Sequence, residues 1–420
     1  MRGKLAFHLS TPATRHILFV ACRSSLVTHM IEKHEKFKRA ILWLPAKLYE
    51  LAVRLRVAAY ETKYRKQKRL DAVVISIGNI ALGGTGKTPM VEYVARYIKS
   101  EDHSVAILTR GYARESSGMR VLNDPRGFSG ADLNSTGGQG GPPHIEAGAN
   151  SNGAASPNRE RAGKAASMRP HLEYGDEPLM LARALPGIPV IINKNRYEGG
   201  LWAERELGAE VLVLDDAYQH LGLARDLNIL LLDATDPFGG FKMAPFGRLR
   251  EPLYGIRRAD AVIVTRANRP FDQGETSAII KYFCGDKVPV MYVYSYIARL
   301  RHVETGTVYE AEQFAGWNAA VMCGIGNPHA FADDILEFGM NIVSENFFSD
   351  HHTFTQEDIE RVTVAARETG ADAIITTEKD AVRMEALKPG DVPIYAAQLE
   401  IQSEDEVRLK SLLLRTLIKK

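Results

Sequence analysis

The chain has 420 residues, of which 45% are hydrophobic and 25% are charged, which is typical of a soluble protein and long enough for two domains. Its three cysteines, Cys22, Cys284 and Cys323, are too few and too scattered for a disulfide framework or a cysteine-based zinc site. This cysteine usage favours a reducing compartment, so we expect a cytoplasmic protein.

The net charge of +2 conceals an uneven distribution along the chain. Residues 1–70 contain 16 Lys and Arg against 4 Glu, so this segment carries about +12 and the rest of the chain about −10. Within it, residues 36–70 mix basic and apolar residues at roughly helical spacing, which predicts an amphipathic helix on an anionic membrane surface rather than a nucleic-acid partner. A first helix packed on the protein's own core explains the same spacing equally well.

No stretch of the sequence is long and apolar enough to predict a helix that spans a bilayer. We therefore expect a protein that lies on a membrane and does not cross it. Residues 1–35 are interpreted as a variable N-terminal extension, because their apolar run is broken by polar residues.

From residue 71 onward, short apolar runs alternate with stretches of helical length. The runs are VVISI, VAILT, PVII, VLVL, NILLLD, AVIVT, VPVMYVY, AAVMCGIG and AIITT. Runs of this length, rich in Val and Ile, predict parallel strands joined by crossover helices, and therefore an α/β fold.

The domain organisation follows from interruptions of this alternation. Residues 121–170 are dominated by Gly, Ser, Ala, Asn and Pro, which predicts a disordered surface insertion because such a segment buries little apolar surface. We expect a first domain at residues 71–290, an extended linker at 291–310 and a smaller C-terminal α/β domain at 311–420.

Residues 78–88, GNIALGGTGKT, lie between the run VVISI and a predicted helix. They resemble the phosphate-binding loop G-x-x-x-x-G-K-[ST], except that Ala81 stands at the first glycine position. In such a loop, backbone amides hold the phosphates, Lys87 contacts the β- and γ-phosphates, and the Thr88 hydroxyl binds Mg²⁺. The nucleotide-binding residues expected here are Gly83, Gly84, Thr85, Gly86, Lys87 and Thr88.

A phosphate-binding loop needs an acidic partner for its metal, normally at the end of another apolar strand. VLVLDDAYQH places Asp215 and Asp216 after such a strand. A polar turn at the end of a strand is the alternative interpretation, but together with Lys87 and Thr88 the metal site is favoured.

Other polar residues have more than one interpretation when they are taken singly. Asp176, in YGDEP, suits the N-terminus of a helix. His351 and His352, in SDHH, suit a metal pair, a general base or a solvated loop. Arg250 suits either a phosphate contact or a surface ion pair.

Taken together, eight blocks in this order resemble the tetraacyldisaccharide 4'-kinase family of lipid A biosynthesis. The blocks are GNIALGGTGKTP, LTRGYARE, YGDEPLMLA, DDAYQHLGLARDLNILLLDA, PFGRLREPL, RADAVIVTR, CGIGNP and SDHH. The resemblance runs from about residue 36 to about residue 390. It implies a phosphate-loop kinase domain and a smaller C-terminal domain, with a basic helix against the membrane.

The resemblance also implies the reaction. A kinase of this family uses ATP and Mg²⁺ to phosphorylate the 4'-hydroxyl of an acylated glucosamine disaccharide 1-phosphate, which gives lipid IVA. The implied location is the cytoplasmic face of the inner membrane, as a peripheral protein with no obligate protein partner.

The resemblance assigns roles to individual residues. Asp176 matches the family's candidate catalytic base, with His351, rather than His352, as its partner. The residues that match metal-binding positions are Thr88, Asp215, Asp216 and Glu251. Lys87 matches a nucleotide-binding position. His220 and Arg250 are second-rank site residues, of which Arg250 is assigned to the nucleotide.

Two questions stay open at this point. The family's loop pattern, G-N-x-x-x-G-G-x-G-K-T, needs no glycine at Ala81, but a GTPase or ATPase switch that regulates a membrane-bound partner is an alternative function for a phosphate-binding loop. The stretch TTEKD, residues 376–380, is either a polar turn at a strand end or a contact to the nucleotide base.

Overall fold

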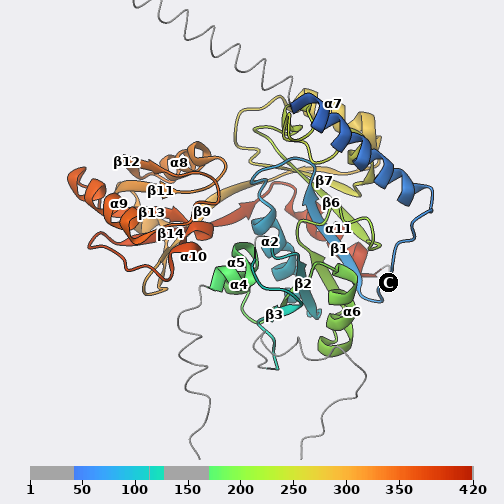
Figure 1. Cartoon of the computed structure of the whole chain (residues 1–420), viewed down its shortest axis with the longest axis horizontal. Helices are drawn as coiled ribbons and strands as arrows, with labels where there is room; N and C mark the ends of the chain where they lie inside the picture. Colours follow the sequence, from blue (N-terminus) through green and yellow to red (C-terminus); the bar gives the residue numbers. More distant parts are fainter. Residues whose placement is uncertain (1–41, 113, 127–169, 419–420) are drawn as a thin grey trace, which may run out of the picture.

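The computed structural model describes residues 42–112, 114–126 and 170–418. In these ranges the chain forms two α/β units that lie side by side, each built on its own sheet (Figure 1). The predicted extension at 1–35, the start of the helix predicted from residue 36 and most of the predicted insertion lie outside the described ranges. None of the described helices is long and apolar enough to cross a membrane.

The larger unit contains a sheet of eight described strands in the order β3-β4-β2-β5-β1-β6-β7-β8. All neighbours pair in parallel except β3 and β4, which are antiparallel. The strands are β1 Val73–Asn79, β2 Val105–Thr109, β3 Arg120–Leu122, β4 Val190–Ile192, β5 Val211–Leu214, β6 Leu227–Asp233, β7 Ala261–Thr265 and β8 Val290–Tyr292.

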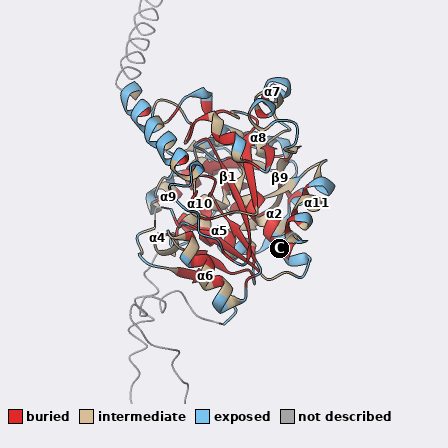
Figure 2. Cartoon of the chain, turned by 90° about the vertical axis from the view of Figure 1, so that its right-hand side faces the viewer, coloured by how far each residue is buried: buried red, intermediate tan, exposed pale blue. Residues whose placement is uncertain are grey.

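Helices cover both faces of this sheet. The helices of this unit are α2 Lys87–Ser100, α4 Pro170–Tyr174, α5 Asp176–Ala184, α6 Arg196–Leu207, η2 Gly239–Phe241, η3 Leu253–Arg258, α7 Gln273–Cys284 and α11 Glu406–Ile418. On one face α2, α5 and α11 share a core with β1, and on the other face α6 and α7 pack. Every residue of β1 is buried, and the strand is red in Figure 2. This confirms the predicted α/β class with a mostly parallel sheet.

The smaller unit contains a sheet in the order β10-β9-β14-β13-β11-β12, of which β11, β12, β13 and β14 are parallel. Its strands are β9 Tyr294–His302, β10 Val308–Glu310, β11 Asn318–Cys323, β12 Asn341–Phe347, β13 Ala373–Thr377 and β14 Ile394–Gln402. Its helices are η4 Ala311–Phe314, α8 Pro328–Glu337, α9 Gln356–Glu368 and α10 Glu378–Met384.

The chain passes between the units at two adjacent places, which differs from the predicted boundaries. Residues 291–310, predicted as a linker, form the end of β8 and the strands β9 and β10, because β9 pairs along β14 and satisfies its backbone hydrogen bonds. The C-terminal helix α11 returns to the larger unit, where Leu409 and Leu413 are buried in the core beside β8. The smaller unit is therefore inserted between β8 and α11.

A helix at residues 42–61, dark blue in Figure 1, lies on the larger unit. Tyr49 donates a hydrogen bond of 2.8 Å from its hydroxyl to the carbonyl of Arg250, and Glu61 pairs with Arg257 at 2.6 Å. Other apolar side chains of the helix face solvent with more than half of their surface exposed: Trp43, Leu44, Leu48, Leu51 and Leu55. Ala46 and Val57 of the helix are buried and Val53 packs on the core, so the helix is docked by apolar and polar contacts and leaves an apolar surface uncovered.

The interface between the units contains a half-buried carboxylate. Glu92 lies on α2, which contacts β14 of the smaller unit. Burial raises the pKa of Glu92 to about 7, and the Glu378 and Glu400 charges add to this against Arg96 and Arg299. The folded protein therefore binds a proton at pH values where the unfolded chain has released it.

Replacing Glu92 with glutamine is expected to stabilise the protein in a pH-dependent way. The folded pKa lies above the ordinary value of 4.5, so the carboxyl contributes stability below pH 4.5 that is lost as the pH rises through 7. Urea unfolding should show Glu92→Gln more stable than the wild type by roughly 1–3 kcal/mol at pH 8, with little difference near pH 4. The exposed Glu360→Gln is the control, and an equal effect of Glu92→Gln at both pH values would contradict the prediction.

Candidate active site

The loop between β1 and α2 has the geometry of a phosphate cradle. Gly83 and Gly86 adopt positive φ angles of 120° and 69°, which residues with a side chain rarely adopt. The side-chain amide of Asn79 donates to the Thr85 hydroxyl at 2.8 Å, and the Thr265 hydroxyl donates to the Thr85 carbonyl at 3.2 Å. The loop is thus fixed from the ends of β1 and β7 and leads into the N-terminus of α2.

Two arginines that the sequence analysis did not single out also hold this loop. Arg248 donates from Nε and Nη2 to the carbonyl of Leu82 at 3.1 and 2.9 Å, and Arg266 donates to the carbonyl of Gly84. A Cβ at Gly83 would lie 2.5 Å from the Arg248 guanidinium, so a side chain here would displace it, and the φ of 120° itself favours glycine. Arg248 lies in the block PFGRLREPL and Arg266 in the block RADAVIVTR, so their place in these blocks is the sequence feature that could have indicated a role.

The predicted lysine and aspartates meet beside this loop. Lys87 Nζ lies 3.7 Å from an oxygen of Asp216, and Arg250 Nη1 donates to both oxygens of Asp216 at 2.8 Å. The buried Asp215 accepts a hydrogen bond of 3.1 Å from the Thr109 hydroxyl. They come together because β5, which precedes the aspartates, lies between β1 and β2 in the sheet.

The two aspartates differ in their electrostatics. Burial raises the pKa of Asp215 to about 7, and the charges of Glu177 and Asp216 raise it further against Lys87 and Arg196. Burial also acts to raise the pKa of Asp216, but the Lys87 and Arg250 charges prevail and lower it. A buried carboxylate that is not compensated by the protein's own cations suits a bound metal ion.

These residues fit Mg²⁺ in the manner of nucleotide-binding enzymes. In the described ranges no three His, Cys, Asp or Glu side chains gather into a metal-binding group. Mg²⁺ bound to a nucleotide needs only one or two protein carboxylates or hydroxyls, because phosphates and waters supply the other ligands. Thr88, at the start of α2, and the aspartate pair meet that requirement.

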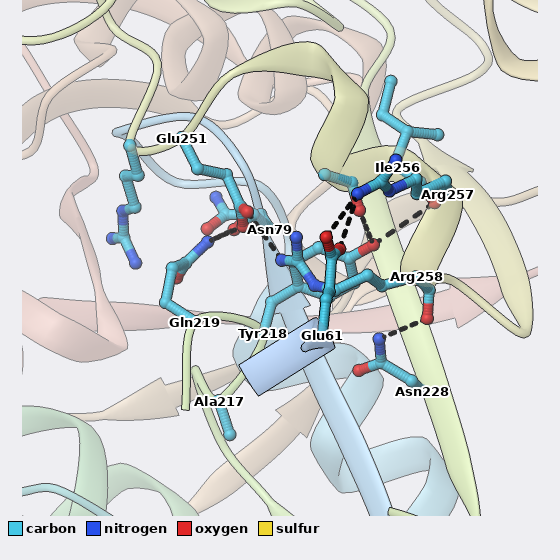
Figure 3. Close-up of polar contacts among 12 residues, drawn as sticks. Glu61, Asn79, Ala217, Tyr218, Gln219, Asn228, Glu251, Ile256, Arg257 and Arg258 are labelled. Carbon is cyan, nitrogen blue, oxygen red and sulfur yellow. Dashed lines mark hydrogen bonds and ion pairs between the residues drawn. The ribbon is translucent and has the colours of Figure 1, made fainter. Parts of the chain in front are cut away.

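Glu251, predicted among the metal ligands, is engaged elsewhere (Figure 3). It is 1% exposed, and its oxygens accept hydrogen bonds from Arg258 at 2.6 Å and from the Gln219 amide at 2.7 Å. The same Gln219 amide donates to the Asn79 carbonyl at 2.7 Å. Through Gln219, Glu251 is linked to the end of β1, and each of its oxygens accepts one hydrogen bond from the protein.

His220 lies among cations. Burial lowers its pKa to about 4, and the charges of Arg196, Arg225, Arg56 and Arg110 lower it further. The imidazole is therefore neutral at physiological pH. The structure brings this second-rank residue close to Arg196, whose Nη2 donates to the Asp215 carbonyl at 3.2 Å.

Asp176 and His351 meet across the two units through a third residue. Asp176 begins α5 of the larger unit, and its Oδ2 accepts from Arg383 Nε at 2.8 Å and Nη2 at 2.6 Å. The same Arg383 Nη2 lies 3.0 Å from Nδ1 of His351. Arg383 of α10 thus contacts both members of the predicted pair. Arg383 was not predicted, because one basic residue on a short helix carries no motif.

The neighbouring His352 has a different environment. Its Nε2 lies 3.0 Å from the carboxylate of Asp358, which also closes the capping box at the start of α9 with Thr355. Of the two histidines, His351 is the one that lies beside Asp176 and Arg383.

The stretch TTEKD forms the turn from β13 into α10. The Thr377 hydroxyl accepts from the Asp380 amide at 3.1 Å and caps the helix, and the buried Asp380 accepts from Arg383 Nη1 at 3.1 Å. These contacts fit the polar turn at a strand end, one of the two interpretations of the sequence.

Comparison with known proteins identifies the family. The family model described as Tetraacyldisaccharide-1-P 4'-kinase matches residues 38–139 and 148–418. The chain is 34% identical over 382 residues to the tetraacyldisaccharide 4'-kinase of Geobacter sulfurreducens, with 89% of this chain and 92% of that protein covered. The chain belongs to the tetraacyldisaccharide 4'-kinase family. This confirms the resemblance seen in the sequence.

Further relatives of the 4'-kinase family agree. The tetraacyldisaccharide 4'-kinase of Halothermothrix orenii is 30% identical over 393 residues, with 89% of this chain and 92% of that protein covered. Among solved structures, the crystal structure of LpxK from Aquifex aeolicus in complex with ATP is similar, with a TM-score of 0.63 and 28% identity over 90% of this chain and 99% of that one.

In this 4'-kinase family member, the quoted blocks gather in two places. GNIALGGTGKTP, DDAYQH and PFGRLREPL surround the phosphate cradle. YGDEP and SDHH meet TTEKD at the interface of the two units. Glu177, next to Asp176 in the sequence, raises the pKa of Asp215 through its charge.

Proposed function

We propose that this protein is an ATP-dependent kinase that phosphorylates the 4'-hydroxyl of a tetraacyl glucosamine disaccharide 1-phosphate, giving lipid IVA. Family membership and the ATP-bound relative from Aquifex aeolicus support the reaction class and the nucleotide. The carrying observation is that α2, which follows the phosphate cradle, and α5, which begins at Asp176, pack in the same core on the larger sheet, and that Asp176 contacts Arg383 of the smaller unit.

The phosphate end of ATP is assigned to the cradle. Backbone amides of residues 83–86 and the N-terminus of α2 bind phosphate oxygens, and Lys87 balances the charge that develops on the transferred group. Thr88, Asp215 and Asp216 would hold Mg²⁺, which neutralises phosphate charge when it is bound. Glu251 would lie beside this set; its two oxygens accept from Gln219 and Arg258, as those of Asp216 accept from Arg250, and each oxygen keeps a lone pair for a metal ion or its water.

Asp176 is assigned to the acceptor hydroxyl. Both hydrogen bonds from Arg383 go to its Oδ2, so Oδ1 is the oxygen offered to the substrate. Phosphoryl transfer through a loose transition state requires an oriented acceptor more than a strong base, and an aspartate that accepts the hydroxyl proton is sufficient. His351 belongs to the same cluster, where burial and Lys379 lower its pKa and keep the ring neutral.

The uncovered surface of the helix at residues 42–61 is assigned to the cytoplasmic face of the inner membrane. A substrate with acyl chains remains in the bilayer, so its kinase has to work at that surface. Exposed Trp and Leu side chains beside Lys and Arg suit a peripheral helix on anionic lipids.

Replacing three of the exposed leucines is expected to release the protein from vesicles. Leu44→Gln, Leu48→Gln and Leu55→Gln together should weaken sedimentation with anionic vesicles by roughly 10²-fold, because each leucine contributes about 1 kcal/mol of apolar burial. The control combines Leu336→Gln, Val364→Gln and Val407→Gln, which change exposed aliphatic side chains elsewhere. Equal sedimentation of both triple variants and the wild type would refute the membrane assignment.

The reaction is tested with γ-labelled ATP, Mg²⁺ and detergent-dispersed tetraacyldisaccharide 1-phosphate. Label in the lipid fraction, dependent on the lipid acceptor, is expected. Label that appears only as free phosphate rejects the kinase and favours the nucleotide-hydrolysing switch, and the same assay with γ-labelled GTP tests whether such a switch prefers guanine.

A further inference from the structure

Arg383 is the only side chain, among those the structure describes, that hydrogen-bonds to both Asp176 and His351. It comes from α10 of the smaller unit, whereas Asp176 begins α5 of the larger unit. Its side chain is 5% exposed in this arrangement. Arg383 and Asp176 therefore join the two units by buried, charge-assisted hydrogen bonds.

The guanidinium is held in a defined orientation by its own unit. Arg383 Nη1 donates to Asp380 at 3.1 Å and to the Gly324 carbonyl at 3.4 Å. The other oxygen of Asp380 accepts from the Gly324 amide and the Thr377 hydroxyl, both at 2.9 Å. Because a guanidinium is planar, fixing Nη1 also fixes the direction in which Nε and Nη2 point.

The other two donor atoms of the Arg383 guanidinium, Nε and Nη2, determine where the Asp176 carboxylate lies. Nε and Nη2 both donate to Oδ2, so the carboxylate is held on one side and its Oδ1 stays available. The His351 ring, in a loop residue with a φ of 61°, is held at Nδ1 by the same Nη2. A simple ion pair between Arg383 and Asp176 would need neither the contact to His351 nor the bonds that hold the guanidinium to Asp380 and Gly324.

We infer that Arg383 is a positioning residue that orients Asp176 and His351 for transfer to the acceptor hydroxyl when the two units meet. This role rests on the kinase function proposed above. It makes assembly of the acceptor site depend on the smaller unit, while the phosphate cradle is built from residues of the larger unit. Loss of Arg383 therefore acts on kcat and not on nucleotide affinity.

The matched control is Arg301. This residue also pairs through Nε and Nη2 with a carboxylate of α10, that of Glu378, at 2.9 and 2.7 Å, and it is partly buried. Its partner lies within the smaller unit. Arg301→Ala thus removes an arginine ion pair of the same kind from the same helix without removing a contact to Asp176.

The experiment measures kcat and KM for both substrates, ATP affinity and thermal stability in Arg383→Ala, Arg383→Lys and Arg301→Ala. In Arg383→Ala, kcat should fall about 10–10²-fold, the range expected for losing charge-assisted hydrogen bonds, with ATP affinity unchanged. Added guanidinium ion should restore part of that kcat, and Arg383→Lys should lie between Arg383→Ala and the wild type.

Three results overturn the inference. These are a kcat loss no larger than that of Arg301→Ala, a rise in KM for ATP in place of the kcat loss, and a kcat loss that guanidinium does not restore at all. If Arg383→Ala does not fold, Arg383→Lys alone decides. A wild-type kcat in Arg383→Lys then overturns the inference, because a lysine has no planar set of donors to orient Asp176 and His351 together. A wild-type protein that labels no lipid rejects the proposed function itself, which separates that failure from one confined to Arg383.

Discussion

Replacing Asp176 with asparagine is expected to lower phosphoryl transfer to the lipid by about 10²–10⁴-fold, with ATP affinity unchanged. Asparagine has nearly the same size and keeps an oxygen that accepts from Arg383, but it cannot take the hydroxyl proton. The measurement is the rate of label transfer at saturating ATP, together with the binding of a fluorescent ATP analogue.

The control for this variant is Glu173→Gln. Glu173 lies three residues earlier, on α4, and pairs with Arg120 at 3.5 Å, so the same chemical change is made outside the Asp176 cluster. Glu173→Gln should retain transfer. Loss of ATP binding in Asp176→Asn would show that Asp176 belongs to the nucleotide site and that its assigned role is wrong.

The second large effect is expected for Lys87→Met. Lys87 is the first residue of α2, its side chain is 10% exposed, and its ammonium lies near Asp216. When it no longer balances the charge on the transferred phosphoryl group, kcat should fall by about 10²–10³-fold. The Arg250–Asp216 pair remains in the variant, and thermal unfolding checks that the variant is folded.

A lysine elsewhere on the same helix controls for the change in net charge. Lys99 lies in the last turn of α2 and is exposed, so Lys99→Met should leave the rate of transfer unchanged. Similar rates in Lys87→Met and Lys99→Met would mean that the glycine-rich loop is not the phosphate site.

The parts of the fold that the sequence predicts are those encoded locally. VVISI is followed by glycines and then by a helix, and a strand buried on both faces needs such a continuous apolar run, so β1, the loop and α2 are predictable. Asp215 and Asp216 are predictable for the same reason, because they follow the apolar run of β5.

What the sequence does not predict depends on pairing between distant residues. The apolar residues of α11 predict a buried face, but nothing local specifies that Leu409 and Leu413 pack on the larger sheet. Glu251 is an acid next to Arg250 in the sequence, and only the fold shows that it accepts hydrogen bonds from Arg258 and Gln219. Arg383 is missed likewise, since its partner Asp176 is 207 positions away.

The two passages of the chain between the units lie next to each other, and this adjacency has a consequence for proteolysis. Tyr294 pairs with Gln402, the Ser403 hydroxyl donates to the Tyr292 carbonyl at 2.7 Å, and the Tyr292 amide donates to Asp405 at 3.2 Å. A protease that cuts one passage leaves the other intact, so a single cut releases neither half. Liberating the smaller unit takes two cuts, one in each passage, and would leave a larger fragment in two pieces held together only by α11 in its core.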